Sequence, residues 1–422
     1  MKEDVLHYMW KFQKFSTFKL ISQGNEKIQI LKSGAHNLNA GPDFLNAQII
    51  INELVWIGNV EIHINASHWY SHHHELDSNY DSVILHVVWN YDADVYRSDN
   101  TIIPTLELKN IADNTLIKNY QSLLQAKNGI NCENEIASID SFTLSNWKER
   151  LFLERLEEKS KFILNELENN HNHWEALLFV LLSKNFGLKV NGESFLSIAQ
   201  SFDFNTLKKC SKNALELEAL FLGQAGLLED EVEELYYYEL KTNYSYLKRK
   251  FNLSNQNVIH ASFFRLRPPN FPTIRLSQLA KLYTERQNLF SEIIQAKTID
   301  EFYAIFFVAA NSYWDTHYNF KVTSSKRKKA LTKKFIDLLL INTVLPLKYS
   351  YASFLGKDIS EEIIELANSI SKEENTIIKE FEEYQINIQN SLESQAIIQL
   401  KTNYCTNNKC LECAIGFKLL KR

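Results

Sequence analysis

Two carboxylates and a histidine near the start of the chain have the spacing of a metal-dependent hydrolytic site. Asp43 follows Pro42 at the head of one strand-like run, and Glu61 and His63 lie two positions apart on the next. Residues i and i+2 of a strand project to the same face, so Glu61 and His63 point together toward Asp43 if the two strands pair. Asp43 and Glu61 are then predicted to hold Mg²⁺ or Mn²⁺, and His63 to position or deprotonate the attacking water.

Two other interpretations of these residues stay open. Glu61 and His63 also fit the polar, solvent-facing side of an amphipathic strand, which carries no chemistry. Glu107 and Lys109 have a similar acid-x-base form, but no Pro-Asp pair leads into them, and we interpret them as part of a surface strand. The site prediction therefore depends on whether the strands that bear Asp43 and Glu61 are paired.

Histidines are concentrated around the same stretch, with eight of the twelve within the first 86 residues. We expect an acid of the first helix and several residues flanking the two strands to line the pocket: Glu3, His36, Asn37, His72, His74 and Asp77. A metal held mainly by imidazoles, such as Zn²⁺, Mn²⁺ or iron, is an alternative to the carboxylate site. His86 lies within an apolar run, and we interpret it as a core histidine.

The cysteines predict a second metal site. Cys405, Cys410 and Cys413 have a C-x4-C-x2-C spacing that lets three thiolates share one ion, and Cys132 is the best candidate for the fourth ligand. Either Zn²⁺ or an iron–sulfur cluster fits this set, and thiols without a ligand remain the alternative. Cys210 lies in a lysine-rich helical run and is interpreted as a lone buried thiol.

Basic side chains form two further groups. Arg265, Arg267 and Arg275 flank a proline-rich loop, and such fixed guanidinium groups suit recognition of a substrate phosphate. An ion-pair loop is an equally good interpretation. The run Lys326–Lys329 opens a predicted helix and is better explained as a solvated helix face than as a nucleic-acid contact.

The elements that must position these residues change in character near residue 140. Before it, a first helix at about 3–15 is followed by short runs rich in Val and Ile, typical of strands, at 28–31, 47–51, 60–64, 83–89 and 102–108. After it, apolar residues recur with helical spacing almost throughout. The sequence predicts an α+β protein with an α/β domain at 1–140, an α-helical domain at 141–400 and a cysteine-bearing tail at 401–422.

Composition limits the classes of function. Hydrophobic residues make up 45% and charged residues 23% of the 422 residues, and the net charge of −5 excludes a uniformly basic nucleic-acid binder. The N-terminal residues lack the apolar core of a secretory leader, and no run approaches the length of a membrane span. We expect a cytoplasmic protein without a membrane partner, and its odd number of cysteines argues against a disulfide framework.

Several phrases spread over nearly the whole chain resemble an uncharacterised bacterial family labelled domain of unknown function 2851. The resemblance rests on His36-Asn37 with Gly41-Pro42-Asp43-Phe44, Gly58-Asn59-Val60-Glu61-Ile62-His63, Val83-Ile84-Leu85-His86-Val87-Val88, Phe221-Leu222-Gly223-Gln224-Ala225-Gly226, Arg265-Leu266-Arg267-Pro268-Pro269-Asn270-Phe271-Pro272 and the closing Cys410-Leu411-Glu412-Cys413. It implies no activity, because the family label carries none.

A second resemblance covers residues 42–63 alone. Pro42-Asp43 followed by Glu61-x-His63 is similar to the PD-(D/E)xK nuclease signature, which implies a restriction-endonuclease-like sheet. His63 stands where that superfamily usually has lysine, so the role of the third residue is open. The cysteine pattern is similar to the iron–sulfur staple of some helicase-associated nucleases, although there the first cysteine precedes the nuclease motifs.

These patterns together favour a metal-dependent phosphodiesterase of nuclease type that acts on DNA or RNA. The alternative is a non-enzymatic scaffold that binds nucleic acid or protein and carries a structural, cysteine-bound metal. A mononuclear His/carboxylate enzyme acting on a small molecule is the third hypothesis, and it requires that histidines hold most of the site metal.

Overall fold

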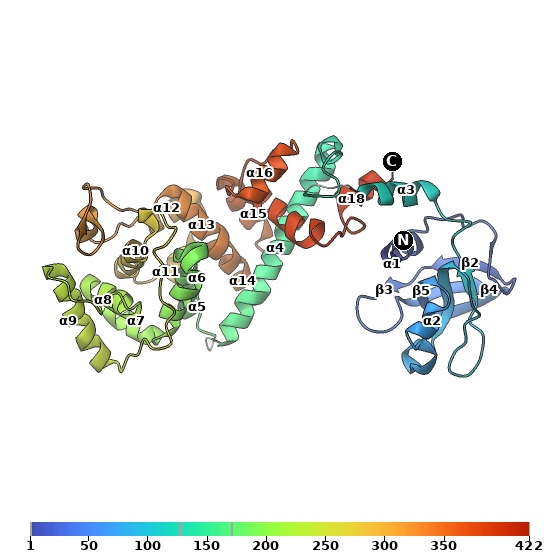
Figure 1. Ribbon diagram of the computed structural model, residues 1–422, viewed down its shortest axis with the longest axis horizontal. Coiled ribbons are helices and arrows are strands. Elements are labelled where there is room, and N and C mark those ends of the chain that lie inside the picture. Colours follow the sequence, from blue (N-terminus) through green and yellow to red (C-terminus); the bar gives the residue numbers. More distant parts are fainter. Residues whose placement is uncertain (1, 126–128, 170–171, 422) are drawn as a thin grey trace. The chain divides into compact units, whose positions relative to one another are not determined.

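A computed structural model describes residues 2–125, 129–169 and 172–421 and shows an α+β chain of two compact units (Figure 1). Residues 1–144 and 401–422 form the first unit, and residues 145–400 form the second. The segment predicted as a separate tail therefore belongs to the N-terminal unit, and the helical unit is inserted into that unit's chain.

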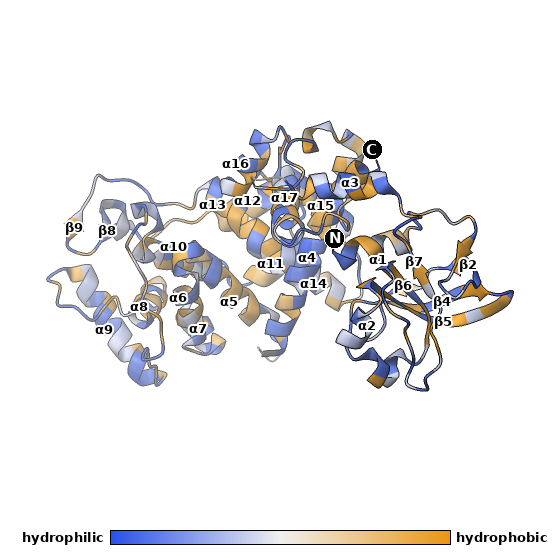
Figure 2. Cartoon of the chain, turned by 45° about the vertical axis from the view of Figure 1, so that its right-hand side comes forward, coloured by the Kyte–Doolittle hydropathy of each residue, from blue (hydrophilic) through white to orange (hydrophobic). Residues whose placement is uncertain are grey.

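The first unit is built on one mixed sheet with the strand order β1-β2-β4-β5-β6-β7, in which β3 also pairs with β4. Strands β2, β4 and β5 are antiparallel neighbours, whereas β5, β6 and β7 run parallel. The strands span Leu20–Ile21, Lys27–Lys32, Ala35–His36, Phe44–Ile51, Leu54–Asn65, Val83–Asn90 and Thr105–Glu107, in order from β1 to β7. Figure 2 shows β4 and β5 as largely hydrophobic ribbons, as expected of strands rich in Val and Ile.

A bulge interrupts the pairing of β4 with β5. Phe44 lies opposite Val60 and Ala47 opposite Gly58, so two residues of β4 face one residue of β5. The bulged Asn46 has a left-handed φ of 56°, and its amide donates to the side chain of Asn59 at 3.1 Å. Because a bulge bends its strand, it re-aims the start of β4, where Asp43 lies.

The crossover from β5 to β6 contains the short helix α2 (His68–Ser71) and two 3-10 turns. His72 follows α2 directly, and His74 begins the first of the 3-10 turns. Trp69 anchors the crossover: it is fully buried in a cluster with Ala66, Val88 and Ile103, and its indole nitrogen donates to the Tyr96 carbonyl at 3.1 Å.

Three helices complete the first unit. Helix α1 (Glu3–Lys11) buries Val5, Leu6, Tyr8, Met9 and Trp10 and contacts β5. It ends four residues earlier than predicted, because Gln13 takes a left-handed φ of 48°. Helices α3 (Asn114–Leu123) and α18 (Ala414–Leu420) contact each other although they come from opposite ends of the chain.

The second unit is helical apart from the β8–β9 hairpin at residues 317–323. Helices α5 and α8 are apolar on nearly all sides and lie at its centre. The helices, beginning with α4, which starts before the division, are α4 (Ser141–Asn169), α5 (Trp174–Phe186), α6 (Leu188–Gln200), α7 (Phe204–Cys210), α8 (Ala214–Gln224), α9 (Leu235–Lys250), α10 (Pro272–Glu285), α11 (Leu289–Gln295), α12 (Ile299–Phe306), α13 (Lys333–Leu339), α14 (Leu345–Phe354), α15 (Ser360–Ser369), α16 (Thr376–Glu383) and α17 (Ser391–Gln399).

The hydrophobic periodicity predicted the presence of helices more accurately than it predicted where they begin and end. Within the nearly continuous helical spacing that the sequence shows after residue 140, breaks separate α10 from α11 and α16 from α17. The break before α17 contains Gln385 with a φ of 63°, which ends a helix regardless of hydrophobic spacing. No helix in the described part of the chain has the length and apolar character needed to cross a bilayer.

Candidate metal centre

The structure brings Asp43 and Glu61 together at the bulged end of the β4–β5 pair. The amide of Asp43 donates to Glu61 Oε2 at 3.1 Å, and the amide of Ile62 donates to Asp43 Oδ2 at 2.9 Å. Glu61 is only 5% exposed, and burial raises its pKa while His74 acts in the opposite direction. The two acids are therefore held by backbone amides rather than left on a solvent-facing strand.

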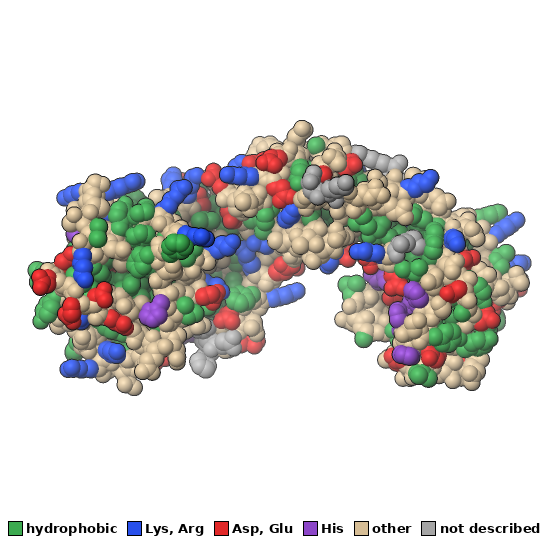
Figure 3. Space-filling model, in the orientation of Figure 1, with side chains coloured by type: hydrophobic (Ala, Val, Ile, Leu, Met, Phe, Trp, Pro, Cys, Tyr) green, Lys and Arg blue, Asp and Glu red, His purple; other side chains and the backbone are tan. Residues whose placement is uncertain are grey.

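Two histidines contact Glu61, and a third contacts one of them. Its Oε1 lies 3.5 Å from Nε2 of His63 and 3.4 Å from Nε2 of His74. Nε2 of His63 also lies 3.1 Å from Nδ1 of His72. Ligand nitrogens of His63, His72 and His74 all fall within 4.8 Å of one another. Figure 3 shows histidine side chains gathered with acidic ones on one face of the first unit.

These distances fit a tetrahedral metal site. Nitrogen or oxygen ligands lie about 2.0–2.2 Å from Zn²⁺, which puts two ligands of a tetrahedron about 3.3–3.5 Å apart. The three measured separations bracket that range. Nε2 of His74 is buried and has Glu61 Oε1 as its near neighbour, so a cation at this point would be held by both groups.

The backbone between two of these histidines has a conformation that is costly for a side chain with a Cβ. His73 has a left-handed φ of 60°, between helix α2 and the following 3-10 turn. This turn brings both His72 and His74 beside His63. Such strain concentrates at functional sites, where the surrounding structure enforces it.

Two buried histidines of the centre, His63 and His86, are held in the neutral form. Burial lowers the pKa of His63 to about 2 and that of His86 to about 3, and neighbouring imidazoles add to both shifts. Both rings are therefore neutral at physiological pH. Nδ1 of His63 lies 2.9 Å from Nε2 of His86, so His86 fixes the orientation of the His63 ring from behind.

Asp43 faces a histidine that the sequence did not single out. Nε2 of His7 on α1 lies 3.2 Å from Asp43 Oδ2. Although burial lowers the pKa of His7, its hydrogen bond and charge interaction with Asp43 raise the value above the ordinary one. The ring of His36 stacks on Phe44 with centroids 4.8 Å apart and lies edge-on to His7.

The remaining predicted pocket residues have more local roles. Asn37 braces the loop before Asp43: its amide donates to the Asp43 carbonyl at 2.7 Å and its side chain to the Pro42 carbonyl at 3.0 Å. Glu3 Oε1 lies 3.7 Å from Nδ1 of His68. Asp77 caps a 3-10 turn by accepting from the Asn79 amide at 2.9 Å, so its carboxylate serves the loop.

The second predicted site also involves residues that are neighbours in the structure. The pKa of Cys132 is raised well above the ordinary value by burial and then by the nearby thiols of Cys405, Cys413 and Cys410. The side-chain amide of Asn131 donates to Cys410 Sγ at 3.3 Å and to the Asn408 side chain at 2.9 Å. All four cysteines belong to the first unit.

The three arginines proposed for phosphate binding lie in the helical unit, and one of them is occupied structurally. Arg275 is 6% exposed; its guanidinium donates to Gln278 and Asn270 at 2.8 and 2.6 Å and lies 3.4 Å from the centre of the Phe335 ring. This removes Arg275 from the predicted substrate contacts. Arg265 and Arg267 are exposed.

The basic run Lys326–Lys329 differs from its predicted form. It precedes α13 as extended chain, and Lys329 is buried, donating to the carbonyls of Trp314 and Asp315. The run is therefore neither a helix face nor a fully solvated patch.

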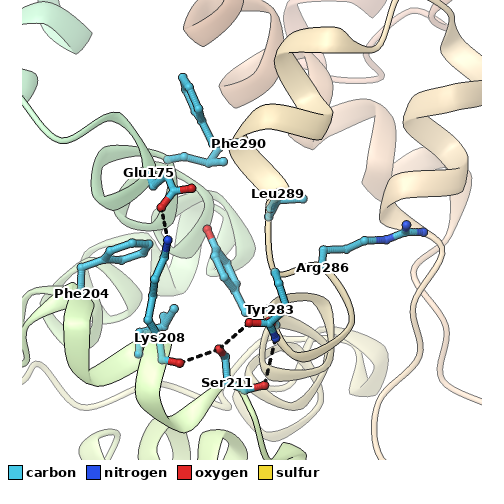
Figure 4. Close-up of a pocket in the computed structure, with 11 residues that line it drawn as sticks. Glu175, Phe204, Lys208, Ser211, Tyr283, Arg286, Leu289 and Phe290 are labelled. Carbon is cyan, nitrogen blue, oxygen red and sulfur yellow. Dashed lines mark hydrogen bonds and ion pairs between the residues drawn. The ribbon is translucent and has the colours of Figure 1, made fainter.

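A pocket in the helical unit is too small to bind a substrate. It has a volume of about 20 Å³, which is room for a single water molecule. Figure 4 shows its lining: Lys208 pairs with Glu175, and the Ser211 hydroxyl donates to the Lys208 carbonyl at 3.0 Å. These contacts close the pocket, so we interpret it as a packing defect between α7 and α10.

Comparison with known proteins gives a family and nothing more specific. The family model described as Protein of unknown function (DUF2851) matches residues 3–376, so the chain belongs to that family. No curated protein and no solved structure matches the chain.

Proposed function

We propose that this member of the family is a metal-dependent phosphodiesterase of nuclease type, with its catalytic ion held by Glu61, His63, His72 and His74. The observation that carries the proposal is the cluster of ring nitrogens of His63, His72 and His74 within 4.8 Å of one another, with Oε1 of the buried Glu61 3.5 Å from His63 and 3.4 Å from His74. A divalent ion bound there neutralises charge on a phosphate oxygen and activates water.

The donor set selects the ion. Imidazole suits Zn²⁺, Mn²⁺ and Fe²⁺, whereas Mg²⁺ prefers an all-oxygen shell with several waters. Of the two ions expected from the sequence, Mn²⁺ fits this set better than Mg²⁺. His63 has both ring nitrogens engaged, by His86 and His72, which favours a ligand over a free general base.

Asp43 and His7 lie beside the ligand set. Their contact at 3.2 Å pairs a carboxylate with an imidazole, and both side chains are about one-fifth exposed. We assign this pair to positioning of the substrate or the attacking water. The choice of a phosphodiester rests on the Pro-Asp and Glu-x-His pattern, which the paired strands β4 and β5 present at one edge.

Hydrolysis assays test the proposal. The full chain is incubated with single- and double-stranded DNA, RNA and bis(p-nitrophenyl) phosphate in Mn²⁺, Zn²⁺ or Mg²⁺. We expect cleavage that falls to background in Glu61→Gln and His74→Ala. His73→Asn is the matched control, because His73 is exposed in the same loop and Asn tolerates its left-handed backbone.

A small-molecule substrate is the second candidate, because histidines supply most of the ligands. Turnover of the small diester without cleavage of any polymer favours it. Binding of nucleic acid or protein with no turnover in any metal, and insensitive to Glu61→Gln and Asp43→Ala, favours the non-enzymatic scaffold and overturns the proposal.

A further inference from the structure

We propose that Cys132, Cys405, Cys410 and Cys413 form a four-thiolate site for a structural zinc ion that joins the segment after α3 to the C-terminal segment. This inference does not depend on the proposed function, because the four cysteines share no residue with the histidine centre. The two clusters therefore make separate predictions.

The first support is the backbone around the four thiols. Lys401 donates to the carbonyl of Gly129 at 2.8 Å, and Asn131 donates to Asn408 at 2.9 Å. These contacts, with that of Asn131 to Cys410 Sγ, bring the residues just before Cys132 against the stretch that contains Cys405 and Cys410. Hydrogen bonds between protein groups therefore hold the two chain segments together without a metal ion.

The second support is the compact loop from Cys405 to Cys413. The amide of Asn408 donates to the Cys405 carbonyl at 3.1 Å, and that of Cys413 to the Cys410 carbonyl at 3.4 Å. A Cβ added to Gly416 meets the Cys410 carbonyl oxygen at 2.0 Å, so α18 approaches this loop as closely as a glycine allows. A C-x2-C pair followed directly by a helix is a common half of a tetrahedral zinc site.

The third support is the environment of the sulfur atoms. Cys413 is buried and the other three are partly buried. Zn²⁺ displaces four thiol protons when it binds, and the amide N–H of Asn131 at 3.3 Å from Cys410 Sγ supplies a hydrogen bond to the resulting thiolate.

Metal analysis of the purified full chain tests the inference. We expect zinc that is lost by one equivalent in Cys132→Ser and in Cys413→Ser. Cys210→Ser is the matched control: it removes a buried cysteine of the helical unit and leaves the zinc content unchanged. His74→Ala removes only metal bound at the histidine centre, so failure of one site is distinguishable from failure of the other.

A measurement on the wild-type chain tests the inference even if the cysteine variants fail to fold. Replacement of zinc by Co²⁺ gives intense thiolate-to-cobalt charge-transfer absorption at a four-sulfur site, which a His/Glu site does not produce. Absence of this absorption, disulfides among the four cysteines, or iron with labile sulfide in place of zinc each overturns the inference.

Discussion

Buried polar groups are treated differently in the two units. In the helical unit the buried ammonium group of Lys348 contacts backbone carbonyls and one carboxylate: it donates to the carbonyls of Ile294 and Ala296 at 2.9 and 2.7 Å and pairs with Glu362 at 3.2 Å. In the first unit the buried ionisable groups contact one another: Nδ1 of His63 lies 2.9 Å from Nε2 of His86, and Oε1 of Glu61 lies 3.4 Å from Nε2 of His74.

This difference distinguishes buried polar groups that stabilise the fold from buried polar groups that form the candidate metal centre. A buried polar group without a partner costs about 1–3 kcal/mol, whereas ionisable groups buried beside one another form a donor set that a bound ion can share. Substitutions in the helical unit should therefore lower stability and spare metal binding, whereas substitutions in the histidine centre should do the reverse.

The largest expected effect is on stability in the helical unit. Lys348→Met leaves several buried carbonyls without a donor, and we expect the free energy of unfolding to fall by about 3–5 kcal/mol. Chemical denaturation measures it, with the exposed Lys357→Met as control. A loss of metal together with stability contradicts the division between the units.

The next effect is on metal affinity in the first unit. Glu61→Gln removes a proposed ligand, and we expect affinity to fall by more than about 100-fold, beyond the range for groups that only support a ligand. Because burial raises the pKa of this carboxyl, the metal-free variant should unfold no more easily than the wild type. Calorimetric titration with Zn²⁺ and thermal unfolding measure the two quantities; unchanged affinity removes Glu61 from the ligand set.

A smaller loss of metal affinity is expected for a residue that contacts a proposed ligand but does not bind the metal itself. His86→Phe keeps a planar ring but loses the contact with Nδ1 of His63, and we expect a loss of about 10–100-fold in metal affinity. Equal affinities in the variant and the wild type mean that the protein does not use His86 to orient His63.

The smallest effect is a pH dependence in the helical unit. Burial lowers the pKa of Lys159 to about 7, and the charge of Arg155 adds to the lowering. Between that value and the ordinary lysine pKa of about 10.4, the unfolded chain binds more protons, so the free energy of unfolding rises with pH.

Lys159→Met should remove that slope. We expect the variant to exceed the wild type by about 1–2 kcal/mol near pH 7, because the partly exposed side chain gives only part of the full effect, and the gain should shrink toward pH 9. Exposed Lys161→Met is the control, and thermal unfolding across this pH range is the measurement. A constant difference between Lys159→Met and the wild type contradicts the assignment.

Sequence patterns predicted the α+β class and most strands because Val and Ile runs are local signals. From the sequence, Asp43 and Glu61 could be predicted to lie close together only if their two strands paired. Strand pairing and the bulge at Asn46 depend on residues distant in the chain, so local patterns do not predict them. His72 and His74 were predicted to line the pocket, but their distances to His63 depend on the left-handed backbone of His73.

Other residues of the centre lay outside the sequence-based hypothesis for physical reasons. His7 reaches Asp43 because α1 packs on β5, a contact between elements far apart in sequence. It does lie one helical turn after Glu3, a spacing that marks one face. His86 was interpreted as a satisfied core histidine, but only Nε2 has a partner among the described residues.

The insertion of residues 145–400 between the two parts of the first unit sets an order during synthesis. Chains emerge from the ribosome N-terminus first, and domains generally fold as units as they appear. The helical unit is fully translated before residue 401 is added, so the sheet-bearing unit can finish folding only after residues 401–422 have emerged. Nascent chains stalled before that point should carry a folded helical unit beside an incomplete partner, a species that chaperones must shield.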